Sequence, residues 1–206
     1  MTKDQEIVIF HYRLGVAISQ WSYVEASIGD IVISLFPTKD LSAPAVAIAL
    51  HSAEGFRAKL KFADGIISRK LAGKPILEQW KKLTKKANTE SGRRNNLAHW
   101  GIKKYWDCQP GKRVVLRPWV FAKPKSTEDR KKPPDGSLRI MDLVQCAQDF
   151  KLLGDSFQEF FRELHGLEAP PRVSPEPIGD PMTVQSLKRE IREVFSASQK
   201  SSRSNF

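Results

Sequence analysis

A long apolar stripe near the start of the chain constrains its fold more than any other feature. Between residues 14 and 35, apolar side chains recur at alternating spacings of three and four residues, the repeat of one face of an α-helix. The stripe consists of Leu14, Ala17, Trp21, Val24, Ile28, Ile31 and Leu35, and Pro37 follows it. Because proline cannot continue a helix, we expect one helix that ends before residue 37 and buries this stripe.

The same repeat returns in the next segment. It begins near Ser42, a residue type favoured at helix starts, with Pro44 in the first turn. The apolar members are Val46, Ala49, Ala53, Phe56, Leu60, Ala63 and Ile67, and Gly73 and Pro75 close the segment. We therefore expect a single second helix over residues 42–73 that packs antiparallel to the first.

A third helical region follows Pro75. Its apolar side is formed by Ile76, Trp80, Leu83 and Ala87. The pair Ser91-Gly92 is expected to interrupt or weaken this helix, which then resumes to about Trp106.

The sequence period then changes. Val114–Leu116 and Trp119–Phe121 are rich in β-prone residues, and residues 138–140 are candidates to pair with them across the polar loop 123–135. A fourth helix is expected from about Met141 to His165. Its apolar face consists of Leu143, Ala147, Phe150, Leu153, Phe157, Phe161 and Leu164.

These elements predict a mainly all-α fold. We expect residues 1–167 to form a four-helix up-and-down bundle with a small β-hairpin insert between the third and fourth helices. Residues 168–206 are expected to form a separate extension, in which a proline-rich linker precedes a short amphipathic helix and a basic, disordered tail. The apolar residues of that short helix are Val184, Leu187, Ile191, Val194 and Phe195.

Charge and composition favour an intracellular protein with an anionic partner. The chain has 34 Lys and Arg against 23 Asp and Glu, a formal net charge of +11, and nucleic acid is the commonest partner of such a chain. Cys108 and Cys146 lie far apart and are read as reduced thiols. No signal peptide or membrane span is visible, so we expect a cytoplasmic protein that does not enter a membrane. The four histidines show no metal-ligand spacing, so neither a metal nor another cofactor is expected.

Six residues suggest a chemistry. Residues 94–99 read RNNLAH. Histidine moves protons near neutral pH, and arginine holds phosphate through a planar fork of donors. On a helix, Asn95 and His99 share a face, and the long side chain of Arg94 can reach the same place. A helix break just before Arg94 would also put the motif in a first turn, where backbone N–H groups favour phosphate.

This string resembles the signature of the HEPN superfamily, an all-helical ribonuclease family. Arg94 matches the family Arg, Asn95 the polar residue after it, and His99 the His, and the likeness covers roughly residues 5–166. The resemblance implies a metal-independent endoribonuclease that leaves a 2′,3′-cyclic phosphate and a 5′-hydroxyl. It also implies a homodimer in which two motifs meet, and a toxin or phage-defence role, with an antitoxin or other protein as a possible partner.

Other residues are candidates to assist this motif. Glu25 borders the buried stripe and could orient Arg94, or else form an interhelical salt bridge. The candidates for RNA binding are Arg93, Lys81, Lys85, Lys103 and Lys104.

Three alternatives to the ribonuclease remain open. In the first, Arg94 is a surface charge, Asn95 a helix cap and His99 a satisfied core histidine. In the second, the chain is a non-catalytic nucleic-acid-binding module. In the third, it is a dimeric helical scaffold for a protein partner.

Overall fold

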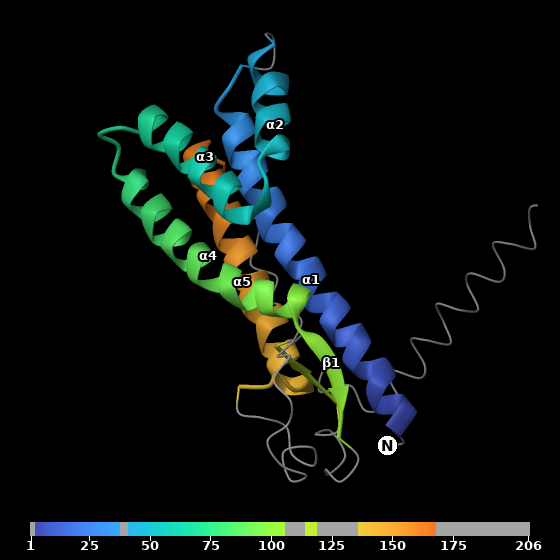
Figure 1. Cartoon of the computed structure of the whole chain (residues 1–206). Helices are drawn as coiled ribbons and strands as arrows, with labels where there is room; N and C mark the ends of the chain where they lie inside the picture. Colours follow the sequence, from blue (N-terminus) through green and yellow to red (C-terminus); the bar gives the residue numbers. More distant parts are fainter. Residues whose placement is uncertain (1–2, 38–40, 106–113, 119–135, 168–206) are drawn as a thin grey trace, which may run out of the picture.

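The computed structural model describes residues 3–37, 41–105, 114–118 and 136–167. In these ranges the chain forms five α-helices and one two-stranded antiparallel sheet (Figure 1). The prediction of a mainly helical fold with a small β element is therefore confirmed. The division of the chain into helices differs from the predicted one at residues 53–55, at Ser91-Gly92 and after His99, and the last two differences affect the candidate site.

Helix α1, Lys3–Ser34, carries the predicted stripe. Ala17, Trp21, Val24, Ile28 and Ile31 are all buried. The helix also extends about three turns before the stripe begins, because Phe10 and the carboxylate of Glu6 are buried as well. One oxygen of Glu6 accepts a hydrogen bond from the backbone N–H of Val114 at 3.2 Å, which ties the start of α1 to the sheet.

The expected single helix over residues 42–73 is wrong. The segment forms two helices, α2 (Ser42–Ser52) and α3 (Gly55–Lys70), separated by an extended Ala53. Gly55 has a φ of 75°, a left-handed conformation that glycine adopts without steric cost, and the chain turns there. The spacing of apolar residues continues across the break and therefore could not show it, although the residues that α2 buries, Ala43 and Leu50, are not members of the repeat.

The turn at Gly55 changes the direction of the chain. Phe56 packs edge-on against Trp21, and Lys59 pairs with Glu25 one turn further along both helices. Helix α3 therefore runs parallel to α1 rather than antiparallel to it.

Helix α4, Ile76–His99, is continuous through Ser91-Gly92, so the expected interruption is also wrong. Ser91 is buried, and its hydroxyl donates to the carbonyl of Asn88 at 2.7 Å, so this side chain is satisfied within the helix. The helix ends at His99 because Trp100 adopts an extended backbone, with φ −81° and ψ 149°. It does not continue to Trp106 as expected.

The sheet pairs two short strands. β1 (Gly101–Lys104) lies antiparallel to β2 (Val114–Arg117), with Ile102 opposite Leu116. The predicted strand at 114–116 is confirmed, and Leu138 pairs with Leu116 through two backbone hydrogen bonds of 2.9 Å. The main partner, β1, was expected to be helix. Residues 119–121 and the loop 123–135 lie outside the described ranges.

Helix α5, Ile140–Leu164, closes the core and matches the prediction to within one residue at each end. It runs parallel to α1. The hydroxyl of Tyr23 donates a hydrogen bond to Asp155, and one turn further along both helices the amide of Gln158 donates to the hydroxyl of Ser27. It runs antiparallel to α4, since Trp80, near the start of α4, packs against Phe157 and Phe160, near the end of α5.

The predicted domain boundary at residue 167 stays a prediction. The proline-rich linker and short helix expected over residues 168–206 lie outside the described ranges and stay predictions. None of the described helices combines the length and apolar character that a bilayer crossing requires.

Candidate functional site

The Arg–His motif occupies the last turn and a half of α4. Asn95 and His99 are exposed, and Arg94 is half-buried. Asn95 and His99 lie four residues apart on one helix, so both side chains project from its solvent side. Because the side chain of His99 is exposed, the alternative that His99 is a buried core histidine is wrong.

Arg94 projects from a different side of the helix than His99. It precedes His99 by five residues, which places the two side chains about 140° apart around the axis. Its Nε is buried and has no hydrogen-bond partner among the described residues. Its Nη1 lies 3.5 Å from Oδ1 of Asn95, which is exposed. The guanidinium therefore lies beside Asn95.

The position of the motif along the helix differs from the expected one. The absence of a break at Ser91-Gly92 puts residues 94–99 at the C-terminal end of α4 rather than in a first turn. Unpaired carbonyls give this end partial negative charge, which favours a cation and disfavours phosphate. Any phosphate bound here must therefore be held by side chains and not by backbone N–H groups.

Two candidate lysines lie on the same face of α4 as His99. His99 follows Lys81 by eighteen residues, which is about five full turns of the helix. Lys85 lies one turn after Lys81, toward His99. The exposed residues along this line are Lys81, Lys85, Asn88, Asn95 and His99. The ammonium group of Lys81 forms an exposed ion pair of 2.7 Å with the carboxylate of Glu78. We call this line the α4 stripe.

Lys103 and Lys104 follow the motif on β1. Both are exposed, and as neighbours on a strand they point to opposite faces of the sheet. Basic side chains thus lie both on α4, which carries His99, and on the strand that follows it.

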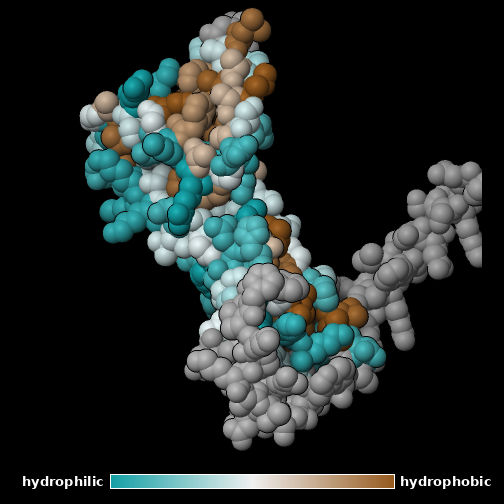
Figure 2. Space-filling view, viewed as in Figure 1, coloured by the Kyte–Doolittle hydropathy of each residue, from teal (hydrophilic) through white to brown (hydrophobic). Residues whose placement is uncertain are grey.

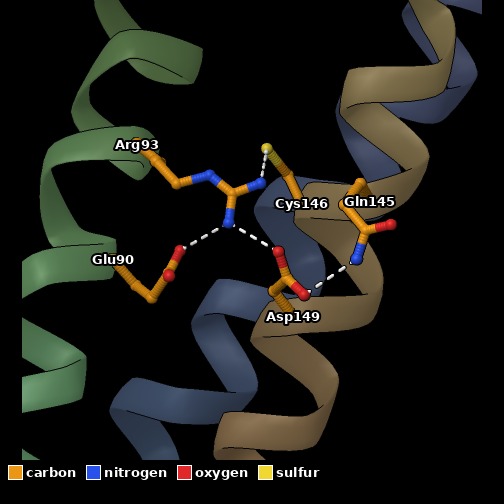
Figure 3. Close-up of polar contacts among 5 residues, drawn as sticks. All are labelled: Glu90, Arg93, Gln145, Cys146 and Asp149. Carbon is orange, nitrogen blue, oxygen red and sulfur yellow. Dashed lines mark hydrogen bonds and ion pairs between the residues drawn. The ribbon is translucent and has the colours of Figure 1, made fainter.

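Arg93 belongs to a different cluster, between α4 and α5 (Figure 3). Its Nη1 lies 2.6 Å from Asp149 and 2.9 Å from Glu90, and its Nη2 donates to the sulfur of Cys146 at 3.2 Å. The guanidinium is thus engaged by two carboxylates and a thiol, apart from the α4 stripe.

The cluster shifts the ionisation of its members. Burial opposes ionisation of Asp149, but hydrogen bonds from Arg93 and Gln145 outweigh it and hold the pKa of the carboxyl below its usual range. Burial also opposes the charge on Arg93, yet Asp149 and Glu90 raise its pKa overall. Burial raises the pKa of the Cys146 thiol, so this cysteine is a neutral, buried group. We call these residues the Arg93 cluster.

The sequence pattern could predict the residues that α4 contributes to this cluster, but not those that α5 contributes. Glu90 and Arg93 are spaced as neighbours on a helix, but Cys146 and Asp149 come from a helix more than 50 residues later.

Glu25 does not reach the motif. One of its oxygens accepts a hydrogen bond from the indole of Trp21 at 2.7 Å, and the other pairs with Lys59 at 3.3 Å. The carboxylate thus connects α1 to α3, and the interhelical salt bridge is the alternative that the structure bears out.

Comparisons with known proteins give no family for this chain. No protein-family model, no curated protein and no solved structure matches it. The HEPN resemblance therefore depends on residues 94–99 and on the helical context.

Proposed function

We propose that this chain is a HEPN-like, metal-independent endoribonuclease whose site is built on Arg94, Asn95 and His99. In this proposal α1, α3, α4 and α5 correspond to the four helices expected from the resemblance, and α2 is an addition. The observation that carries the proposal is that Asn95 and His99 are exposed one turn apart on α4, with the Arg94 guanidinium beside Asn95. The α4 stripe adds positive charge along the approach to this site.

The roles follow from the chemistry of each side chain. His99 takes the proton from a ribose 2′-hydroxyl, and the 2′-oxygen attacks the adjacent phosphorus. Arg94 stabilises the negative charge that develops on the phosphorane. Asn95, between them, positions the guanidinium or the phosphate. The bond from phosphorus to the 5′-oxygen then breaks, which leaves a 2′,3′-cyclic phosphate and, once that oxygen is protonated, a 5′-hydroxyl.

A second proton donor is needed for the leaving oxygen. Within the described residues α4 carries no histidine besides His99, and burial raises the pKa of the Cys146 thiol in the neighbouring Arg93 cluster. We infer that His99 of a second chain supplies this proton, which requires a homodimer with two motifs facing each other.

Incubation of the full chain with RNA in EDTA tests the proposal. We expect cleavage by the wild type, and a loss of about a hundred- to ten-thousand-fold in rate for His99→Ala. His11→Ala is the matched control, because His11 is also an exposed helical histidine, and its Nδ1 lies 2.9 Å from the carbonyl oxygen of Ile7 in its own helix. Full activity in His99→Ala, or cleavage only with added divalent metal, would contradict the mechanism.

One observation favours a second candidate, a nucleic-acid-binding module without catalysis. The last-turn position of the motif offers no backbone donors to a phosphate, whereas the α4 stripe needs none. In that case RNA binds with strong salt dependence and remains intact in the same assay.

A further inference from the structure

An apolar cavity lies between α1, α2 and the start of α3, on a part of the molecule that the proposed function does not use. Its volume is about 360 Å³. Its apolar lining comes from Ile28, Ile33, Leu50, Phe56 and Leu60. Its polar lining includes Glu25 and Asp30 from α1 and Lys59 from α3.

Helix α2, beside this cavity, exposes more of its surface to solvent than its apolar composition leads us to expect. It has no Asp, Glu, Lys or Arg, and a helix apolar on all sides is normally buried. Only Ala43 and Leu50 are buried, while Ile48 is 67% exposed and Leu41, just before the helix, is 85% exposed. Figure 2 shows the resulting brown and tan area at the top of the molecule, over α2. We call the cavity and this exposed side of the helix the α2 surface.

The described chain ends next to this surface. The ring of His165, just after α5, lies 2.8 Å from the hydroxyl of Ser34 at the end of α1. Ser34 directly follows Ile33, which lines the cavity. Whatever follows Leu167 therefore starts at the edge of the α2 surface.

The following sequence contains a segment that fits this surface. Residues 182–195 have the spacing of an amphipathic helix, with Leu187 and Ile191 at the centre of its apolar face. On a helix, Lys188 and Arg192 border one side of that face and Glu190 borders the other. In the cavity lining, Glu25 and Lys59 already pair with each other, so the charge that can face this basic border is the exposed carboxylate of Asp30 on α1.

The connecting sequence is long enough. Fourteen residues, 168–181, separate the last described residue from this segment. In an extended proline-rich conformation they span up to about 43 Å. The face of α1 that lines the cavity, from Ser22 to Ile33, is only about 16 Å long.

We propose that residues 182–195 bind the α2 surface of the same chain as an amphipathic helix. Its apolar face covers the cavity and the exposed side of α2, and its basic border lies along Asp30 of α1. The short linker makes this contact intramolecular, with an effective concentration near the millimolar range. A segment that binds with a Kd of about 0.1 mM is then bound in roughly nine chains out of ten.

Hydrogen exchange of the full-length chain, measured by mass spectrometry, tests this contact. Leu187→Asp combined with Ile191→Asp places two charges on the apolar face. We expect amide exchange to rise about tenfold in residues 42–60, with α5 unchanged as an internal reference. The control, Gln185→Asp with Ser186→Asp, adds the same charge to the opposite face and should leave exchange at residues 42–60 as in the wild type.

Three results would overturn the proposal. The first is unchanged exchange at residues 42–60 in the apolar-face variant, and the second is an equal effect in the control. The third is protection that disappears on dilution of the wild type, which would assign the α2 surface to a second copy.

Discussion

Gly154 lies on α5 against the ring of Tyr23 on α1. A Cβ at this position would overlap the ring of Tyr23, so only glycine fits without movement of one helix. The ring is also restrained, because its hydroxyl bonds Asp155 at 3.3 Å. This contact allows the two parallel helices to approach along their length.

We expect Gly154→Ala to lower the free energy of unfolding by about 1–3 kcal/mol, since the added methyl group overpacks the contact. Gly65→Ala on α3 is the control, because nothing lies within 4 Å of its Cβ position. There the gain in helix propensity should raise the free energy of unfolding by about 0.5–1 kcal/mol. Urea denaturation measures both, and a Gly154→Ala variant as stable as the wild type would contradict the close approach.

At the scale of elements, the Arg93 cluster joins the C-terminal third of α4 to α5. It leaves Asn95 and His99 facing solvent while the helix that carries them is held to the core. We therefore expect the cluster to position the motif through the backbone of α4, without contact to RNA.

Asp149→Asn tests the contribution of this cluster through its dependence on pH. The pKa of Asp149 is lowered in the folded state, so its contribution is complete above the unfolded value of about 3.9 and is lost as pH falls through the folded pKa. We expect the variant to lose up to about 1 kcal/mol at pH 7 relative to wild type. The difference should narrow below about pH 4 as Asp149 becomes protonated.

The control is Glu78→Gln, which removes an exposed ion pair with Lys81 and should change stability little. Thermal melts of the three proteins from pH 2 to pH 7 measure the effect. An Asp149→Asn deficit that stays constant over this range would assign the loss to packing instead of charge.

Sequence patterns predicted the elements that carry one continuous apolar face. Helices α1 and α5 follow from their stripes because burial is periodic along each. The turn at Gly55 was missed because the apolar spacing continues across it, even though α2 buries Ala43 and Leu50, which are not members of that repeat, and only the glycine marked the change of direction. β1 was missed because Ile102 stands among Gly101 and two lysines, and its strand state comes from pairing with the buried residues of β2.

The motif residues were visible in the sequence, but their surroundings were not. The side of α4 on which Arg94 lies depends on where the helix ends. The separation of Arg93 from the site depends on Asp149 and Cys146, which are distant in sequence.

For the whole molecule, the proposed chemistry requires two chains. One His99 per chain serves one proton transfer, and the reaction needs two. We expect light scattering at tens of micromolar to give twice the mass of a single chain, and His99→Ala to give the same mass. A monomer at that concentration would count strongly against the composite site.

The parallel arrangement of α1 and α5 also affects how the protein is made. The bonds from Asp155 and Gln158 reach residues more than 130 positions earlier in the chain. During synthesis, Trp21 cannot pack against Phe150 until α5 has left the ribosome. The core therefore forms late in synthesis, through contacts between residues distant in sequence. A nascent chain that stalls before residue 140 would expose most of the α1 stripe, which makes it a substrate for chaperones.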